Sequence, residues 1–127
     1  MAGFLIRGTF AALALSALGT TGAHAADAGA GRTYFKSHCA VCHGDTANSP
    51  PGIGPRLFGV VGRKAGTFPG FHYSSARAAA GFAWTPEQLR LYVASPQGVV
   101  KGNKMPFPGI AGEGDRANVV AYLQTLR

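Results

Sequence analysis

Apolar positions repeat at helical spacing near the C-terminus of the chain. They fall at i, i+3, i+4 and i+7, on Val119, Tyr122, Leu123 and Leu126. This spacing places the four side chains on one face of an α-helix. The pattern predicts an amphipathic helix that starts near Asp115 and buries that face against the rest of the molecule.

A second helix is expected over residues 28–40, where Phe35 and Cys39 lie four residues apart and share a face. Between residues 45 and 70, glycine, proline and serine recur too closely for regular structure. The sequence shows no internal repeat and no convincing strand pattern. The expected fold is therefore all-α, with helices near both ends and a loop-rich middle.

Three shorter helices are expected between that loop and the C-terminal helix. Serine and alanine favour a short helix over residues 74–80. The next helix has clear start signals, with Thr85 as the N-cap, Pro86 as the first helical residue and Gln88 completing a capping box. Pro96 begins a further short helix or turn. The buried face of the middle helix would consist of Leu89, Tyr92 and Val93.

The first 25 residues have the pattern of a secretory signal peptide. A single positive charge at Arg7 precedes an apolar run over residues 8–18, and an Ala-x-Ala cleavage pattern follows at residues 23–25. The apolar run is well short of the ~20 residues that cross a bilayer. We expect cleavage after Ala25, a periplasmic location without stable membrane insertion, and one mature domain over residues 26–127.

Both cysteines of the chain lie in one motif, Cys-Ala-Val-Cys-His at residues 39–43. The spacing allows Cys39 and Cys42 each to form a thioether with one of the two vinyl groups of a protoporphyrin. The next residue, His43, then lies under the iron as its proximal ligand. The motif predicts one covalently bound haem c.

Two other uses of a Cys-x-x-Cys pair agree less well with the sequence. A structural zinc site takes four nitrogen or sulfur ligands, usually from two separated pairs, and no second pair at ligand spacing is present. A thioredoxin-like redox disulfide belongs to a βαβ setting, which the flanking sequence does not provide. Two exported thiols would normally oxidise to a disulfide, and haem attachment is the competing fate of such a pair.

Met105 is the only methionine after residue 25, and it lies in a polar segment rich in glycine and proline. A lone methionine usually fills a core, but no helical apolar period surrounds this one. We therefore expect its sulfur to be the sixth iron ligand, which favours Fe(II) and closes the iron to external ligands. The alternatives are His38, too close to the proximal side, and His72, expected at the surface of a loop.

Basic residues outnumber acidic ones, 12 against 5, for a formal net charge of +7. The electrostatic field of a positively charged protein steers it toward acidic partners. The basic residues are scattered along the chain and the protein is expected to be exported, so nucleic acid is not the expected partner.

The chain resembles the class I c-type cytochromes over its whole mature length, particularly mitochondrial-type cytochrome c and its periplasmic bacterial relatives. Beyond the haem motif, the matching stretches are Gly-Pro-Arg-Leu (54–57), Val-Gly-Arg-Lys-Ala-Gly (61–66), Pro-Gly-Phe-His-Tyr (69–73), Trp84, Lys-Met (104–105) and Val-Ala-Tyr-Leu (120–123). The resemblance implies the small c-type cytochrome fold, in which helices and loops surround one haem.

The resemblance also implies roles for individual residues. The Pro55 carbonyl would accept a hydrogen bond from the proximal imidazole. Tyr73 and Trp84 would hydrogen-bond the haem propionates, and Arg63 would place a cation near them. Tyr92 would lie beside the methionine ligand, and Phe107 would cover the haem edge. The two terminal helices would meet through Gly31 and Phe35 on one side and Tyr122 on the other.

Four positions depart from the family pattern. Arg77 stands where an asparagine is usual, and Asn103 replaces a threonine that often donates a hydrogen bond to the methionine sulfur, which Asn103 can still do. Pro106 replaces an isoleucine after the ligand, and His38 replaces a lysine on the docking face.

With both axial positions filled, we expect a soluble, monomeric one-electron carrier and not an enzyme. It would shuttle electrons between membrane-bound donor and acceptor complexes with acidic docking surfaces. The resemblance suggests four docking charges: Lys36, Arg56, Lys101 and Lys104. The alternatives are a haem enzyme or gas-binding sensor with an open sixth site, and a haem subunit of an oxidase or dehydrogenase that stays tethered by an uncleaved N-terminus.

Overall fold

The computed structural model describes residue 3 and residues 24–127, and the regular structure there is entirely helical. In chain order the helices are α1 (Ala28–His38), α2 (Ser75–Ala78), α3 (Pro86–Ala94), α4 (Pro96–Val99) and α5 (Glu113–Leu123). Within these residues the only β-pairing is one isolated bridge between Lys64 and Ala83. The expected all-α class is confirmed, and so is the loop-rich middle.

The expected signal peptide, residues 1–25, lies outside the described residues except for residue 3 and residues 24–25. Over the part of the chain that the structure describes, no helix has both the length and the apolar character needed to cross a membrane.

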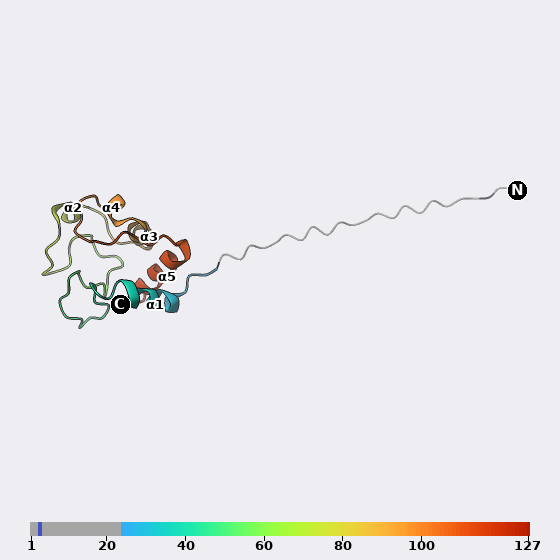
Figure 1. Cartoon of the computed structure of the whole chain (residues 1–127), viewed down its shortest axis with the longest axis horizontal. Coiled ribbons are helices and arrows are strands. Elements are labelled where there is room, and N and C mark those ends of the chain that lie inside the picture. The colour runs from blue at the N-terminus through green and yellow to red at the C-terminus, as the bar shows by residue number, and fades with distance from the viewer. Residues whose placement is uncertain (1–2, 4–23) are drawn as a thin grey trace.

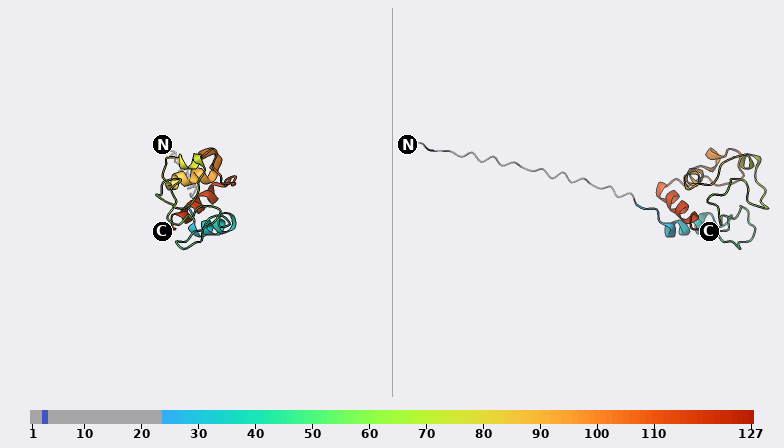
Figure 2. Two further views of the ribbon diagram at one scale, coloured as in Figure 1. Left: turned by 90° about the vertical axis from the view of Figure 1, so that its left-hand side faces the viewer. Right: turned by 180° about the vertical axis from the view of Figure 1, so that it is seen from behind.

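Helices α1 and α5 come from opposite ends of the described chain and lie side by side (Figure 1), an arrangement that is also visible in both views of Figure 2. The Phe35 ring is fully buried, with its centroid 5.4 Å from that of Tyr122. A Cβ on Gly31 would overlap the Asn118 carbonyl oxygen of α5 and lie 3.0 Å from the Tyr122 Cβ. The expected contacts of Gly31 and Phe35 with the C-terminal helix are confirmed.

The first helix begins at an N-cap that the sequence analysis did not identify. The Asp27 carboxylate accepts hydrogen bonds from the backbone N–H groups of Gly29 (2.8 Å) and Ala30 (3.1 Å), which satisfies two of the free donors at a helix start. The helix ends at His38, two residues earlier than expected. Its last turn closes because the N–H groups of Cys39 and Ala40 both donate to the Phe35 carbonyl.

The third helix starts where its sequence signals indicate. The Thr85 hydroxyl accepts from the Gln88 N–H at 3.1 Å, and Pro86 is the first helical residue. The reciprocal half of the expected capping box is wrong, because the Thr85 N–H donates to the Ala83 carbonyl instead. Of the expected buried face, Leu89 and Tyr92 are buried and Val93 is partly buried.

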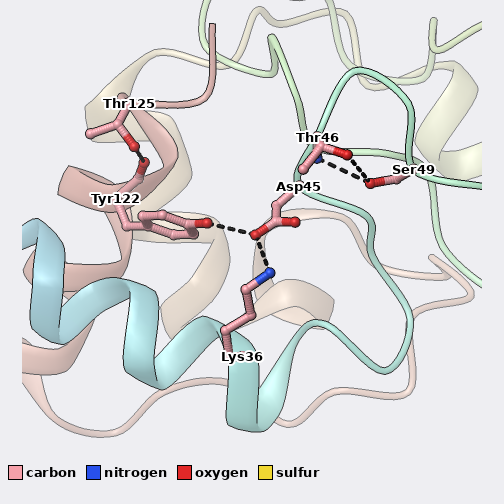
Figure 3. A network of polar contacts seen from close by, with 6 residues as sticks. All are labelled: Lys36, Asp45, Thr46, Ser49, Tyr122 and Thr125. Carbon is pink, nitrogen blue, oxygen red and sulfur yellow. Dashed lines mark hydrogen bonds and ion pairs between the residues drawn. The ribbon is translucent and has the colours of Figure 1, made fainter.

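The Asp45 carboxylate joins α1, the loop after the cysteine motif and α5 (Figure 3). It accepts hydrogen bonds from the Lys36 ammonium and from the Tyr122 hydroxyl, both at 2.6 Å. Burial alone would raise the pKa of this carboxyl, but the hydrogen bonds from Lys36 and Tyr122 outweigh burial and hold the pKa below its usual range. The ionised form of Asp45 is therefore the one that stabilises the folded chain.

Asp45→Asn should lower the free energy of unfolding by about 2 kcal/mol at pH 7, because hydrogen bonds to a charged group contribute about that much. Denaturant unfolding measures the change, with the exposed Glu87→Gln as a matched control. The pKa of Asp45 is lower in the folded chain than its unfolded value of about 4. Ionised Asp45 therefore stabilises the fold fully above about pH 4, and this stabilisation is lost as the pH falls through the folded-state pKa. The difference from wild type should therefore shrink in acid; equal stability at pH 7 would contradict the assignment.

Candidate functional site

A cavity of about 370 Å³ is bounded by α1, α2, α3, α5 and the loops between the helices. Its walls are mostly apolar. The groups with chemistry on those walls are two thiols, one imidazole, one thioether and two guanidinium groups: Cys39, Cys42, His43, Met105, Arg63 and Arg77. Residues from four separate segments of the sequence thus meet around one space.

The cysteine motif turns sharply as it leaves α1. The N–H groups of Cys42 and His43 both donate to the Cys39 carbonyl, at 3.0 and 2.9 Å, so the two thiols and the imidazole all reach the same cavity. Burial, together with the neighbouring Cys42, raises the pKa of the Cys39 thiol to about 11.

The His43 ring is held by a hydrogen bond and by close packing. Its Nδ1 lies 2.7 Å from the Pro55 carbonyl oxygen. Because a carbonyl can only accept, Nδ1 carries the proton and the lone pair of Nε2 is left free. Burial lowers the pKa of His43, against the Pro55 hydrogen bond and with the help of the Arg77 charge. A Cβ on Gly54 would lie 2.7 Å from Nδ1, so only glycine fits against this ring.

The segment that carries Met105 is anchored by Asn103, which is buried. The Asn103 side-chain oxygen accepts from the Met105 N–H at 2.9 Å, and its amide nitrogen donates to the carbonyls of Pro96 (3.0 Å) and Val100 (2.8 Å). Asn103 could donate to the sulfur by its residue type, but its amide nitrogen donates to these two backbone carbonyls instead.

Tyr92 is the residue that contacts the Met105 sulfur. Its hydroxyl donates to Sδ across 3.6 Å and accepts a hydrogen bond from the Arg77 guanidinium. Burial raises the pKa of Tyr92, and the charge and hydrogen bond of Arg77 oppose that rise. Arg77 departs from the family pattern, and its contact with Tyr92 was not predicted from the sequence.

The other residues expected at the site also line the cavity, and each has contacts of its own. The Tyr73 hydroxyl accepts from the Phe68 N–H at 3.2 Å. Arg63 donates to the Arg56 carbonyl at 2.9 Å. Trp84 is buried and packs edge-on against Tyr92, with centroids 4.9 Å apart. Phe107 is partly buried and reaches the same space.

Three of the four expected docking charges make contacts within the chain. Lys36 pairs with Asp45, Arg56 donates to the carbonyls of Ala47 and Ser49, and Lys104 donates to the His72 carbonyl. The fourth, Lys101, is exposed. Lys36 therefore has its charge matched by a carboxylate, which weakens its case as a docking residue.

The two histidines weighed as alternative iron ligands do not line the cavity. His38 is exposed and stacks on Tyr34, with ring centroids 4.1 Å apart, and His72 is exposed in its loop. Among the described residues, no group of three or more His, Cys, Asp or Glu could hold a metal ion by itself.

The cavity fits a c-type haem by the chemistry of its donors. It combines two thiols for thioether bonds, a neutral imidazole with a free Nε2, a thioether sulfur, and apolar walls with arginines to balance carboxylates. A family model described as cytochrome c matches residues 28–127. The chain belongs to the cytochrome c family. This cytochrome c carries one haem c, covalently attached through Cys39 and Cys42.

Curated relatives agree with the family assignment. The chain is 42% identical over 97 residues to cytochrome c2 of Rhodopila globiformis, covering 76% of this chain and 91% of the relative. It is 42% identical over 103 residues to cytochrome c2 of Rhodoblastus acidophilus, covering 81% and 95%. It is 46% identical over 76 residues to cytochrome c of Trypanosoma brucei brucei, covering 60% and 82%.

Proposed function

We propose that this cytochrome c is an exported, soluble one-electron carrier with His43 and Met105 as the axial ligands of its haem iron. The observation that carries the proposal is that the imidazole and the sulfur line one cavity with both haem-attaching cysteines. Each of the two donors also has a hydrogen-bond partner that orients it, Pro55 for the imidazole and Tyr92 for the sulfur.

The haem supplies an iron that alternates between Fe(II) and Fe(III). The Pro55 hydrogen bond holds the His43 ring in the tautomer that leaves Nε2 free to ligate. Asn103 fixes the backbone at Met105, so the sulfur is presented by an anchored segment. The apolar walls exclude water from the site. Donors anchored in this way would move little when the iron changes oxidation state, which would suit electron transfer.

Two firm axial ligands separate a carrier from the other haem proteins considered. A haem enzyme or gas-binding sensor needs a sixth position that is open or easily vacated. A haem subunit tethered to an oxidase or dehydrogenase needs residues 1–25 to persist as an anchor. The proposal instead takes residues 1–25 as a cleaved signal peptide, with residues 26–127 forming one domain in the periplasm.

The proposed partners are membrane-bound electron donor and acceptor complexes with acidic docking surfaces. The protein would bind them as a monomer. Loss of Arg7 with the signal peptide leaves 11 basic against 5 acidic residues, a formal net charge of +6 for the polypeptide. This positive charge supports the choice, because opposite charges accelerate encounter with an acidic partner. Of the four docking cations that the resemblance suggests, Lys36, Lys101 and Lys104 are exposed, and Lys104 also lines the cavity.

The purified protein should have the mass of residues 26–127 plus one haem, and its oxidised form should show a sulfur-to-iron charge-transfer band. The reduced form should bind carbon monoxide slowly or not at all, since the sixth position is filled. Recovery in membranes with residues 1–25 retained would favour the tethered subunit. Rapid carbon monoxide binding would favour the enzyme or sensor.

A further inference from the structure

Arg77 is a buried cation of the cavity wall that pairs with no carboxylate side chain among the described residues. It is 9% exposed and lies in α2. The ion pairs among the described residues are Lys36–Asp45, Arg90–Glu113 and Arg116–Glu113, and none includes Arg77. Within the chain, uncharged groups therefore fix the position of the guanidinium.

Two aromatic rings and one hydroxyl contact the Arg77 guanidinium. The Arg77 guanidinium carbon lies 4.2 Å from the centroid of the Tyr92 ring and 5.0 Å from that of Trp84. The ring faces attract a cation, and more strongly when the pair is removed from water. The guanidinium also donates a hydrogen bond to the Tyr92 hydroxyl.

The direction of that hydrogen bond determines where the Tyr92 proton goes. A guanidinium has five N–H donors and no acceptor. Tyr92 therefore cannot donate to Arg77, and its single O–H proton is left for another acceptor. The acceptor within reach is the Met105 sulfur, 3.6 Å from the hydroxyl oxygen. A neutral amide at position 77 could accept as well as donate, and would leave the direction of the hydroxyl undecided.

The position of Arg77 is itself well defined by the backbone around it. The Ser74 hydroxyl accepts from the Arg77 N–H at 3.2 Å and caps the short helix. On the other side, Gly66 has φ of +74°, and a Cβ there would lie 2.7 Å from the Arg77 carbonyl oxygen and 2.9 Å from the Ala78 Cα. The loop therefore packs directly against α2 and holds the residue that contacts Tyr92.

We propose that Arg77 is a positioning residue that directs the Tyr92 proton onto the Met105 sulfur and thereby raises the reduction potential of the haem. The proposal rests on the function proposed above, with Met105 as an iron ligand. A hydrogen bond on the thioether withdraws electron density from the sulfur. Fe(III) needs that density more than Fe(II) does, so the reduced state is favoured.

A buried cation can also disfavour Fe(III) directly through space. The two routes differ in their dependence on Tyr92. An effect relayed by the hydroxyl disappears when the hydroxyl is removed, whereas a through-space effect persists. A double-mutant cycle between positions 77 and 92 therefore separates them.

The test is the reduction potential of the holoprotein at pH 7, measured for Arg77→Met in the wild-type and in the Tyr92→Phe background. With Tyr92 present, we expect the equilibrium constant for reduction to fall about tenfold, which is 59 mV for a one-electron couple. With Phe at position 92, the fall should be less than about threefold. Arg90→Met, which removes an exposed arginine on α3, should leave the potential unchanged.

Arg77→Lys provides a second variant that keeps the buried charge if Arg77→Met does not fold. A lysine also donates without accepting, so it should retain most of the potential, and any loss should again require Tyr92. If Arg77→Met, or an Arg77→Lys variant that lowers the potential, lowers it equally in both backgrounds, the relay through Tyr92 is overturned. An unchanged potential in Arg77→Met would overturn any role of Arg77 in tuning.

The same samples separate this proposal from the proposed function. A wild type without the sulfur-to-iron charge-transfer band, or with rapid carbon monoxide binding, would remove Met105 as a ligand whatever Arg77 does. A wild type that shows the band, but whose potential does not respond to position 77, would leave the carrier function standing and overturn the role of Arg77 alone.

Discussion

Met105→Ala should give a protein that keeps its covalent haem but binds carbon monoxide readily in the reduced state. Cys39 and Cys42 are unaffected, so attachment persists, while the sixth position loses its sulfur. The charge-transfer band of the oxidised form should vanish. The equilibrium constant for reduction should fall by a factor of more than ten, about 59 mV for each tenfold change, because a thioether favours Fe(II). Spectroelectrochemistry and stopped-flow mixing with carbon monoxide measure these changes.

Lys104→Ala is the matched control, since it changes the neighbouring residue of the same anchored segment and leaves the sulfur in place. It should keep the band and exclude carbon monoxide. If the wild type bound carbon monoxide as fast as Met105→Ala, Met105 would not be a firm ligand. The enzyme or sensor would then replace the carrier as the best account of the site.

Gly31→Ala should destabilise the fold by about 3 kcal/mol, near the upper end of the usual range for overpacking. The added methyl group would overlap the backbone carbonyl oxygen of Asn118, which no side-chain rotation can relieve. Helices α1 and α5 would have to separate, which would disturb the packing of Phe35 on Tyr122. Unfolding of the holoprotein in guanidinium chloride gives the change in free energy.

Gly114→Ala makes the same change in α5 at an open position, where nothing lies within 4 Å of the new methyl group. It should leave stability unchanged or raise it by about 0.5–1 kcal/mol, because alanine loses less backbone conformational entropy on folding into a helix than glycine does. A Gly31→Ala variant as stable as wild type would show that the two helices can move apart freely at this crossing.

Helical periodicity and capping signals predicted all the longer helices. The haem motif and the resemblance to c-type cytochromes predicted most of the residues that line the cavity. The ends of the helices were harder to predict. Helix α5 begins at Glu113, two residues before the expected start. This start could not be predicted, because the N-cap residue is Gly112, which has no side chain to form a cap that a sequence pattern would reveal. Leu126 follows the apolar period and is buried, yet it lies beyond the end of the helix.

The interactions that sequence reasoning missed join residues far apart in the chain. Asp45 meets Tyr122 across 77 positions, and nothing in the loop around Asp45 indicates this partner. Asn103 was correctly seen as polar, but only the folded loop shows that its amide is used on the backbone. The sequence showed only that Arg77 is an unusual residue type at its position. Its role depends on the ring and the hydroxyl of Tyr92, which tertiary packing places against it.

The pairing of α1 with α5 has a consequence for the order of events during synthesis. The Asp27 N–H donates to the Asn118 side chain across 91 positions, so the first helix acquires its partner only when nearly the whole chain has been made. Until then residues 39–43 belong to a segment whose neighbour is still missing. Pairing of α1 with α5 completes the cavity that Cys39 and Cys42 line, so both thiols are more accessible before the two ends of the chain meet than afterwards.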